Sequence, residues 1–172
     1  GSEQLQVADA DQIVTFSSDF GDGRLVIRYT FKPESYEIVM EVEKHNSASF
    51  MTRAGYELVS SGGIPFAEGL GNQEAQVAAA LARTGGEVEQ INLTSEPNER
   101  TTLNGTIEWL AVKNGFFAAI MIPDGETRGA ELEGVRVDDA EGTVLSKHYN
   151  TRLMVPDTGI EIDAYRLYVG PV

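Results

Sequence analysis

Strict alternation of apolar and polar residues is the feature of this chain that most limits its fold. The run from Gly23 to Phe31 reads GRLVIRYTF. Its first set of alternate positions comprises Leu25, Ile27, Tyr29 and Phe31, and the other, more polar set comprises Arg24, Val26, Arg28 and Thr30. Because successive side chains of a β-strand point to opposite faces, this segment predicts a half-buried strand.

A second alternating run follows at once. It extends from Tyr36 to Lys44, after the short link Lys32-Pro33-Glu34-Ser35. The apolar residues expected to face the core are Tyr36, Ile38, Met40 and Val42, and the outward ones are Glu37, Glu41 and Glu43. Two alternating runs joined by a short polar link predict an antiparallel hairpin.

Shorter runs of the same kind fill the rest of the chain. They are Gln12 to Phe16, Tyr56 to Val59, Val88 to Leu93, Thr106 to Val112, Phe116 to Ile122, Gly134 to Val137, Thr143 to Ser146, Tyr149 to Val155 and Tyr165 to Val169. The pairs Asp22-Gly23, Asn104-Gly105, Asn114-Gly115 and Asp124-Gly125 supply residues that tolerate positive φ in tight turns. Many short strands with regular turns predict an all-β sandwich or barrel, and 172 residues suit a single domain.

One segment conflicts with an all-β interpretation. Residues 72–83 read NQEAQVAAALAR, which is rich in strong helix formers, and Gly85-Gly86 behind it would suit a helix end. Local propensity therefore predicts a helix. A strand of small residues would also suit the centre of a closely packed sheet, and tertiary packing often overrides propensity, so both interpretations stay open on the residues alone.

The charge balance limits the possible partners. The 27 acidic residues outnumber the 13 lysines and arginines, so the net charge is −14 and the isoelectric point is near 4.4. Such a chain is repelled by phosphate backbones and anionic headgroups, and we expect no nucleic acid partner. The absence of cysteine excludes disulfides and thiolate metal sites. The longest apolar run, Phe116 to Pro123, is too short to cross a bilayer.

The two histidines are the first candidates for catalysis. His45 and His148 each follow a lysine near the end of a predicted strand. Either could form a general acid/base pair with a carboxylate such as Glu68 or Glu161, as sugar-epimerising β-sandwich enzymes require. A histidine beside a lysine in a loop is more often a solvated residue, so we expect no catalytic role for either side chain.

Other patterns of site chemistry are incomplete. Asp9, Asp11, Asp19 and Asp22 come closest to a calcium loop, but their spacing is wrong for one. Gly69-Leu70-Gly71 lacks the third glycine of a dinucleotide fingerprint, and Ser60-Ser61 has no histidine nearby in sequence. We expect no metal, no cofactor and no catalytic residue, which favours a binding or structural role.

Residues 106–123, TIEWLAVKNGFFAAIMIP, carry the clearest resemblance to a known family. This segment resembles the periplasmic domain of bacterial YidC-type membrane protein insertases, where a Trp-x-Ala-x-Lys/Gln-x-x-Phe/Tyr-Phe run leads into an apolar strand. Residues 23–31, 85–89 and 167–171 are similar to further pieces of that family, in the same order. The signature positions, for which we expect packing roles, are Trp109, Lys113, Phe116, Phe117, Pro123, Gly170 and Pro171.

The resemblance implies a twisted antiparallel β-supersandwich of the galactose-mutarotase-like type, with little helix and with Val77 to Leu81 on a strand. It implies a non-catalytic domain at the periplasmic face of the inner membrane, whose membrane segments lie outside this chain. The implied partners are nascent membrane proteins and Sec translocon components such as SecDF. We expect Gly1-Ser2 to be a tag remnant and residues 3–172 to be one periplasmic domain.

Two other functions fit the same sequence. A carbohydrate-binding or mutarotase-like β-sandwich would hold a sugar with acidic and aromatic side chains, and His45 or His148 would then contribute to binding. A purely structural spacer would need no binding surface at all. The insertase domain is the leading hypothesis because four separate segments support it.

Overall fold

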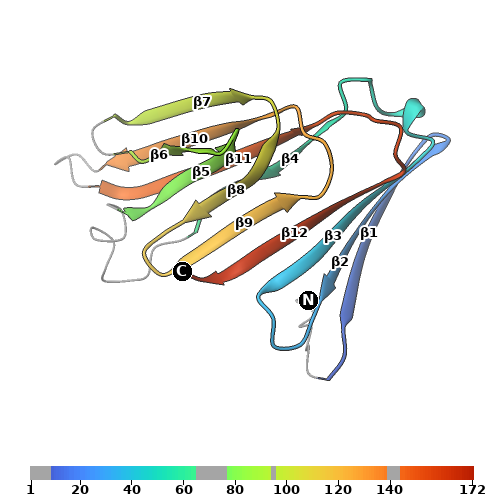
Figure 1. Ribbon diagram of the computed structural model, residues 1–172, viewed down its shortest axis with the longest axis horizontal. Coiled ribbons are helices and arrows are strands. Elements are labelled where there is room, and N and C mark those ends of the chain that lie inside the picture. Colours follow the sequence, from blue (N-terminus) through green and yellow to red (C-terminus); the bar gives the residue numbers. More distant parts are fainter. Residues whose placement is uncertain (1–8, 65–76, 94–95, 139–143) are drawn as a thin grey trace.

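The computed structural model describes residues 9–64, 77–93, 96–138 and 144–172, and these form two antiparallel sheets (Figure 1). The large sheet has the order β1-β2-β3-β12-β9-β8-β5-β6, and the small sheet has the order β4-β11-β10-β7. The strands are β1 Gln12–Phe20, β2 Gly23–Phe31, β3 Glu37–His45, β4 Tyr56–Ser60, β5 Ala79–Thr84, β6 Glu87–Ile91, β7 Asn98–Asn104, β8 Ile107–Lys113, β9 Phe117–Pro123, β10 Gly129–Asp138, β11 Val144–Val155 and β12 Ile162–Pro171. A short 3-10 helix, η1, covers Ser47–Ser49. The all-β prediction is confirmed.

The small sheet covers only part of the large one. Strands β10 and β11 pack on β5, β6 and β8, whereas β1, β2 and β3 extend beyond the sandwich as a separate limb (Figure 1). The predicted hairpin is confirmed, because β2 and β3 are antiparallel neighbours. Their pairing runs from Arg24 opposite His45 to Phe31 opposite Ile38. We call β1, β2 and β3 the limb. Its inner face continues the inner face of the large sheet without a cover from β10 or β11.

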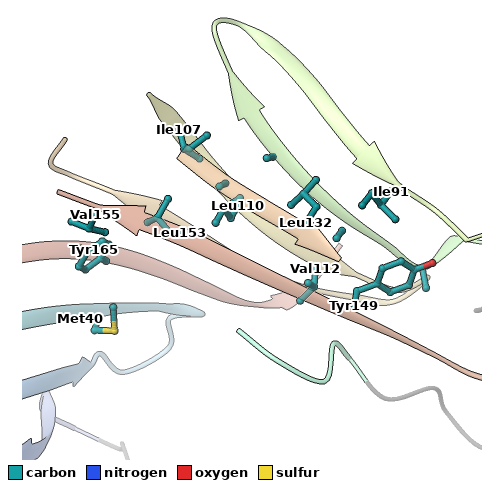
Figure 2. Close-up of a cluster of buried hydrophobic side chains, with 14 of the residues drawn as sticks. Met40, Ile91, Ile107, Leu110, Val112, Leu132, Tyr149, Leu153, Val155 and Tyr165 are labelled. Carbon is teal, nitrogen blue, oxygen red and sulfur yellow. The ribbon is translucent and has the colours of Figure 1, made fainter. Parts of the chain in front are cut away.

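The core lies between the two sheets (Figure 2). Leu110 and Val112 of β8 face Leu132 of β10 and Leu153 of β11, and all four are buried. Tyr149 of β11 closes one end of this core, where its hydroxyl accepts the N–H of Leu93 at 3.1 Å. Aliphatic side chains from both sheets therefore supply most of the driving force for sandwich formation.

Strand β5 resolves the conflict between helix propensity and the all-β pattern. Ala79, Ala80 and Ala82 have no exposed surface, because β5 lies between β6 and β8 with the small sheet against its inner face. Small side chains allow that close approach, and the packing outweighs the helix preference of alanine. The strand expected over Val77 to Leu81 is confirmed from Ala79 onward, but Val77 and Ala78 precede β5, and residues 72–76 lie outside the described residues.

Several details of the strand prediction were wrong. The alternation rule misses β7, because NERTTLN has no apolar alternation. The runs expected at 143–146 and 149–155 are not two strands, since residues 144–155 form one strand, β11, and residue 143 lies outside the described residues. Val26 was placed on the polar side but is buried, and Tyr36 was placed in the core but is exposed. Alternation indicates which side a residue points to, whereas neighbouring strands decide how far that side is covered.

The turn predictions were only partly correct. Gly105 has the expected positive φ of 107°, but Gly23 is the first residue of β2 and Gly21 takes the left-handed position instead. Gly85 and Gly86 are both left-handed and join β5 to β6, so they end a strand rather than a helix. Among the described residues, no helix is long and apolar enough to cross a membrane.

Candidate functional site

A row of apolar side chains crosses the inner face of the large sheet. Phe31, Ile38, Leu167, Met121 and Leu110 are successive cross-strand neighbours on β2, β3, β12, β9 and β8. The small sheet buries Leu110, while the other four side chains are only half-buried. Among the described residues, this row is therefore a partly exposed apolar strip, the kind of surface at which proteins contact apolar partners.

A groove of about 150 Å³ lies on this row at the border of the small sheet. It is lined by Ser60, Leu110, Ala119, Ile120, Met121, Thr151, Leu167 and Val169. Only two of these residues have polar side chains, and Val169 is exposed. Pockets for small molecules usually exceed about 300 Å³, so this groove suits one or two apolar side chains of a larger partner better than a sugar.

Polar side chains join the two sheets beside this row. Lys44 of β3 is buried with its Nζ atom 2.6 Å from Oδ2 of Asp163 on β12. Tyr56 of β4 donates its hydroxyl to the same oxygen at 2.7 Å. The buried lysine charge is therefore compensated, and the outer strand of the small sheet is attached to the large sheet where the sandwich opens.

The tyrosines of this polar junction are donors rather than bases. The hydroxyl oxygens of Tyr56 and Tyr165 are 2.5 Å apart, and Tyr165 donates to Tyr56 because Tyr56 donates to Asp163. Burial raises the pKa of Tyr165 to about 12. Burial, followed by the hydrogen bonds with Tyr165 and Asp163, raises the pKa of Tyr56 far above its usual value. Both phenols stay protonated at neutral pH, so the junction has a structural role.

His45 lies between two carboxylates on the outer face of the large sheet. Its Nε2 atom is 2.7 Å from Glu43, and its Nδ1 atom is 2.6 Å from Glu161. Arg28 forms an ion pair with the other oxygen of Glu43. Of the two carboxylates considered as partners of the histidines, Glu161 contacts His45, whereas Glu68 lies outside the described residues.

His148 does not join this cluster. It lies in β11 of the small sheet, and its Nε2 atom is 3.1 Å from the Ser146 hydroxyl. Glu43, His45 and Glu161 offer ligand atoms within 4.8 Å of one another, and the described part of the chain holds no other such group. Both ring nitrogens of His45 already contact carboxylates, so an ion-pair network accounts for the cluster without a metal.

Comparison with known proteins identifies the family. The family model of the YidC periplasmic domain matches residues 1–172. This chain belongs to the YidC periplasmic domain family. Membrane protein insertase YidC of Pelodictyon phaeoclathratiforme is 32% identical over 150 residues, which cover 85% of this chain and 25% of that protein. The insertase of Prosthecochloris aestuarii is 30% identical over 170 residues, covering 96% of this chain and 28% of that protein. The chain spans about a quarter of the length of these curated relatives.

Two signature residues of this YidC domain are not where we expected them. The resemblance predicts packing roles for Phe116 and Phe117, yet they are 49% and 52% exposed. The Asn114 side chain accepts the N–H groups of both residues at 2.9 Å and so shapes the turn between β8 and β9. Phe117 lies two residues before Ala119, on the inner face of β9 that borders the groove. Phe117 therefore adds an exposed ring to the inner face beside the groove.

The YidC signature at the end of the chain meets this turn. Pro171 lies opposite Phe117 in the β9–β12 pairing, and Gly170 lies opposite Ala118. Gly170 is buried, and a Cβ atom there would lie 2.7 Å from the Tyr36 ring, so a larger residue would force that ring to move. Two signature segments distant in the sequence thus meet at one end of the β9–β12 pair, in the middle of the large sheet.

The other signature positions are half-buried. Trp109 and Lys113 lie on β8 opposite Arg83 and Ala79 of β5, and Pro123 ends β9 opposite Tyr165. Their packing roles remain predictions. The groove itself was not foreseen, because its lining comes from strands of both sheets and no motif marks it.

Proposed function

We propose that this chain is the non-catalytic periplasmic domain of a membrane protein insertase and that it assists insertion by contacting substrate proteins or Sec translocon partners such as SecDF. Residues 3–172 would form one domain at the periplasmic face of the inner membrane, connected to membrane segments outside this chain. The observation that carries the proposal is the open apolar row that leads from Phe31 to the groove beside Leu167.

The chemistry of this surface fits an unfolded or partly folded membrane protein. Such a chain exposes consecutive apolar side chains before insertion, and each could enter the groove or lie along the half-buried row. The net charge of −14 disfavours contact with anionic headgroups, which leaves the apolar surface to protein partners. No atom of the partner needs to react, which agrees with the protonated tyrosines beside the row.

Photo-crosslinking from single positions in the full-length insertase tests this proposal. A photoreactive residue in place of Val169 or Phe117 should form crosslinks with a nascent membrane protein or a Sec partner. Ile162 is the matched control, because it is an exposed apolar residue of β12 on the opposite face. Equal crosslinking yields from Val169 and Ile162 would contradict the proposal, since contact would then be independent of the apolar row.

The carbohydrate-binding alternative lacks support among the described residues. The groove is small and mainly aliphatic, and the two histidines lie in different sheets. A sugar site needs converging polar and aromatic groups within one cleft. We therefore put forward no second function.

A further inference from the structure

Strand β1 is the outer strand of the limb, and one of its edges has no partner among the described strands. A two-residue turn, Gly21-Asp22, joins Phe20 of β1 to Gly23 of β2, with Gly21 at a φ of 62°. In such a hairpin the closing residues form a hydrogen-bonded pair, and every second pair along the strands repeats that arrangement. The backbone groups of the residues in between point away from β2. They belong to Ile13, Thr15, Ser17 and Asp19.

The other three sheet edges are shorter than β1 and carry at least as many charged residues on fewer positions. Strand β6 has five residues with two glutamates, β4 has five with one glutamate, and β7 has seven with a glutamate and an arginine. Short length and charge protect edges from pairing with other chains. Strand β1 has nine residues, and its first seven, Gln12 to Ser18, carry no charge and no proline. This edge alone is unprotected among the described strands.

The side chains of β1 add an apolar component to the open edge. Ile13 is 63% exposed and Phe16 is 59% exposed, on opposite faces of the strand. Phe16 contacts Tyr29 of β2 edge to face, with ring centroids 6.1 Å apart. A strand added beside β1 would place its own alternate side chains next to Phe16 and so extend the inner apolar face of the limb.

Acidic residues bracket this apolar edge. Asp9 and Asp11 precede β1, and Asp19 and Asp22 lie at its other end, all of them exposed. Among the described residues, these aspartates form one ion pair, between Asp19 and Arg24. It is 3.7 Å long and exposed on both sides, so it neutralises little of the acidic charge. A complementary segment therefore has an apolar centre and basic residues at both ends.

We propose that the free edge of β1 binds an extended polypeptide segment of this kind by strand addition. The inference rests on the proposed function, since the segment would come from a substrate protein of the insertase. Main-chain hydrogen bonds would provide affinity, and they would form with Ile13, Thr15, Ser17 and Asp19. The aspartates at the two ends of β1 would favour segments with basic residues on both sides of the apolar centre. A second copy of this chain fits poorly, because antiparallel β1–β1 pairing would bring Asp9 of one copy close to Asp22 of the other.

Binding of a labelled peptide to this chain tests the proposal. The probe is a fluorescently labelled peptide of about twelve residues, with Lys-Arg at each end and alternating valine and threonine between them. Its binding is measured by fluorescence anisotropy. Thr15→Pro removes an outward N–H group without touching the β1–β2 hydrogen bonds, and should weaken binding about tenfold or more. Thr15→Val keeps that group and is the matched control, and thermal melting checks that both variants fold.

Peptide chemistry gives a second, independent readout. Two peptides are compared, one N-methylated at the odd-numbered amides and one at the even-numbered amides. Only one of them should lose binding, because the N–H groups of only one peptide edge would face β1. The double variant Asp11→Asn/Asp19→Asn should weaken binding severalfold at low salt and reduce its salt dependence. Equal effects of the two N-methylated peptides would overturn strand addition.

The outcomes separate this proposal from the broader function. Binding that survives Thr15→Pro but is lost in Val169→Asp would overturn the role of β1 and support contact through the groove. If both Thr15→Pro and Val169→Asp still bind the peptide, and if Val169 forms no crosslink in the insertase, both proposals are contradicted. Concentration-dependent dimerisation that Thr15→Pro removes would assign the edge to a second copy and overturn the choice of partner.

Discussion

Replacing Asp163 by asparagine should destabilise the domain through the lysine that Asp163 compensates. The Lys44 side chain is 1% exposed, and its Nζ atom lies 2.6 Å from the Asp163 carboxylate. Asparagine keeps the size and an oxygen acceptor for Tyr56, so the substitution removes little but the negative charge. An uncompensated buried charge costs about 3 to 5 kcal/mol, a large part of a typical domain stability of about 5 to 15 kcal/mol.

Urea unfolding, followed by the fluorescence of the single tryptophan, Trp109, measures this loss. With a slope of about 3 kcal/mol per molar urea, the midpoint should fall by at least about 1 M. The matched control is Asp124→Asn, because Asp124 forms a 3.3 Å ion pair with Arg166 that is exposed on both sides, and its loss should cost under about 1 kcal/mol. Lys44→Met combined with Asp163→Asn should restore much of the midpoint. Equal urea midpoints for Asp163→Asn and Asp124→Asn would refute the argument that Asp163 compensates a buried lysine charge.

Three further predictions concern the junction, a turn and the core. Burial raises the pKa of Tyr165 to about 12, while an unfolded tyrosine ionises near pH 10. The contribution of Tyr165 to the free energy of unfolding should therefore be fully present below about pH 10 and be lost between about pH 10 and 12. Melting curves recorded over this pH range should show a smaller loss of stability for Tyr165→Phe than for the unmodified chain. Gly55→Ala should cost more than Gly159→Ala in urea unfolding, since both have positive φ but only the Gly55 substitution brings a Cβ within 1.9 Å of the Val155 carbonyl oxygen. Leu132→Ala should cost about 2 to 5 kcal/mol, and a loss under about 1 kcal/mol would mean that the core refills the space.

Alternation in the sequence was enough to predict most strands and the all-β class. The β2–β3 hairpin and the inward positions Met40 and Val42 follow from the period of two, because that period has one geometric solution in a pleated strand. Strand β7 could not be found in this way, since its position depends on hydrogen bonds to β10 and on ion pairs of Arg100 rather than on an apolar face. Composition shows that the chain has two histidines and no cysteine, but it could not show where the two histidines lie in the fold.

The sequence by itself determined which residues share a face, the family, and the charge that shapes possible partners. Only the tertiary structure decided that the alanines of β5 form a strand, that Phe116 and Phe117 are exposed, and that one edge of β1 has no partner among the described strands. The physical reason is the same in each case. Alternation sets the direction of a side chain, whereas burial, edge pairing and groove formation depend on which distant strand lies above it, and that is a property of the assembled sheets.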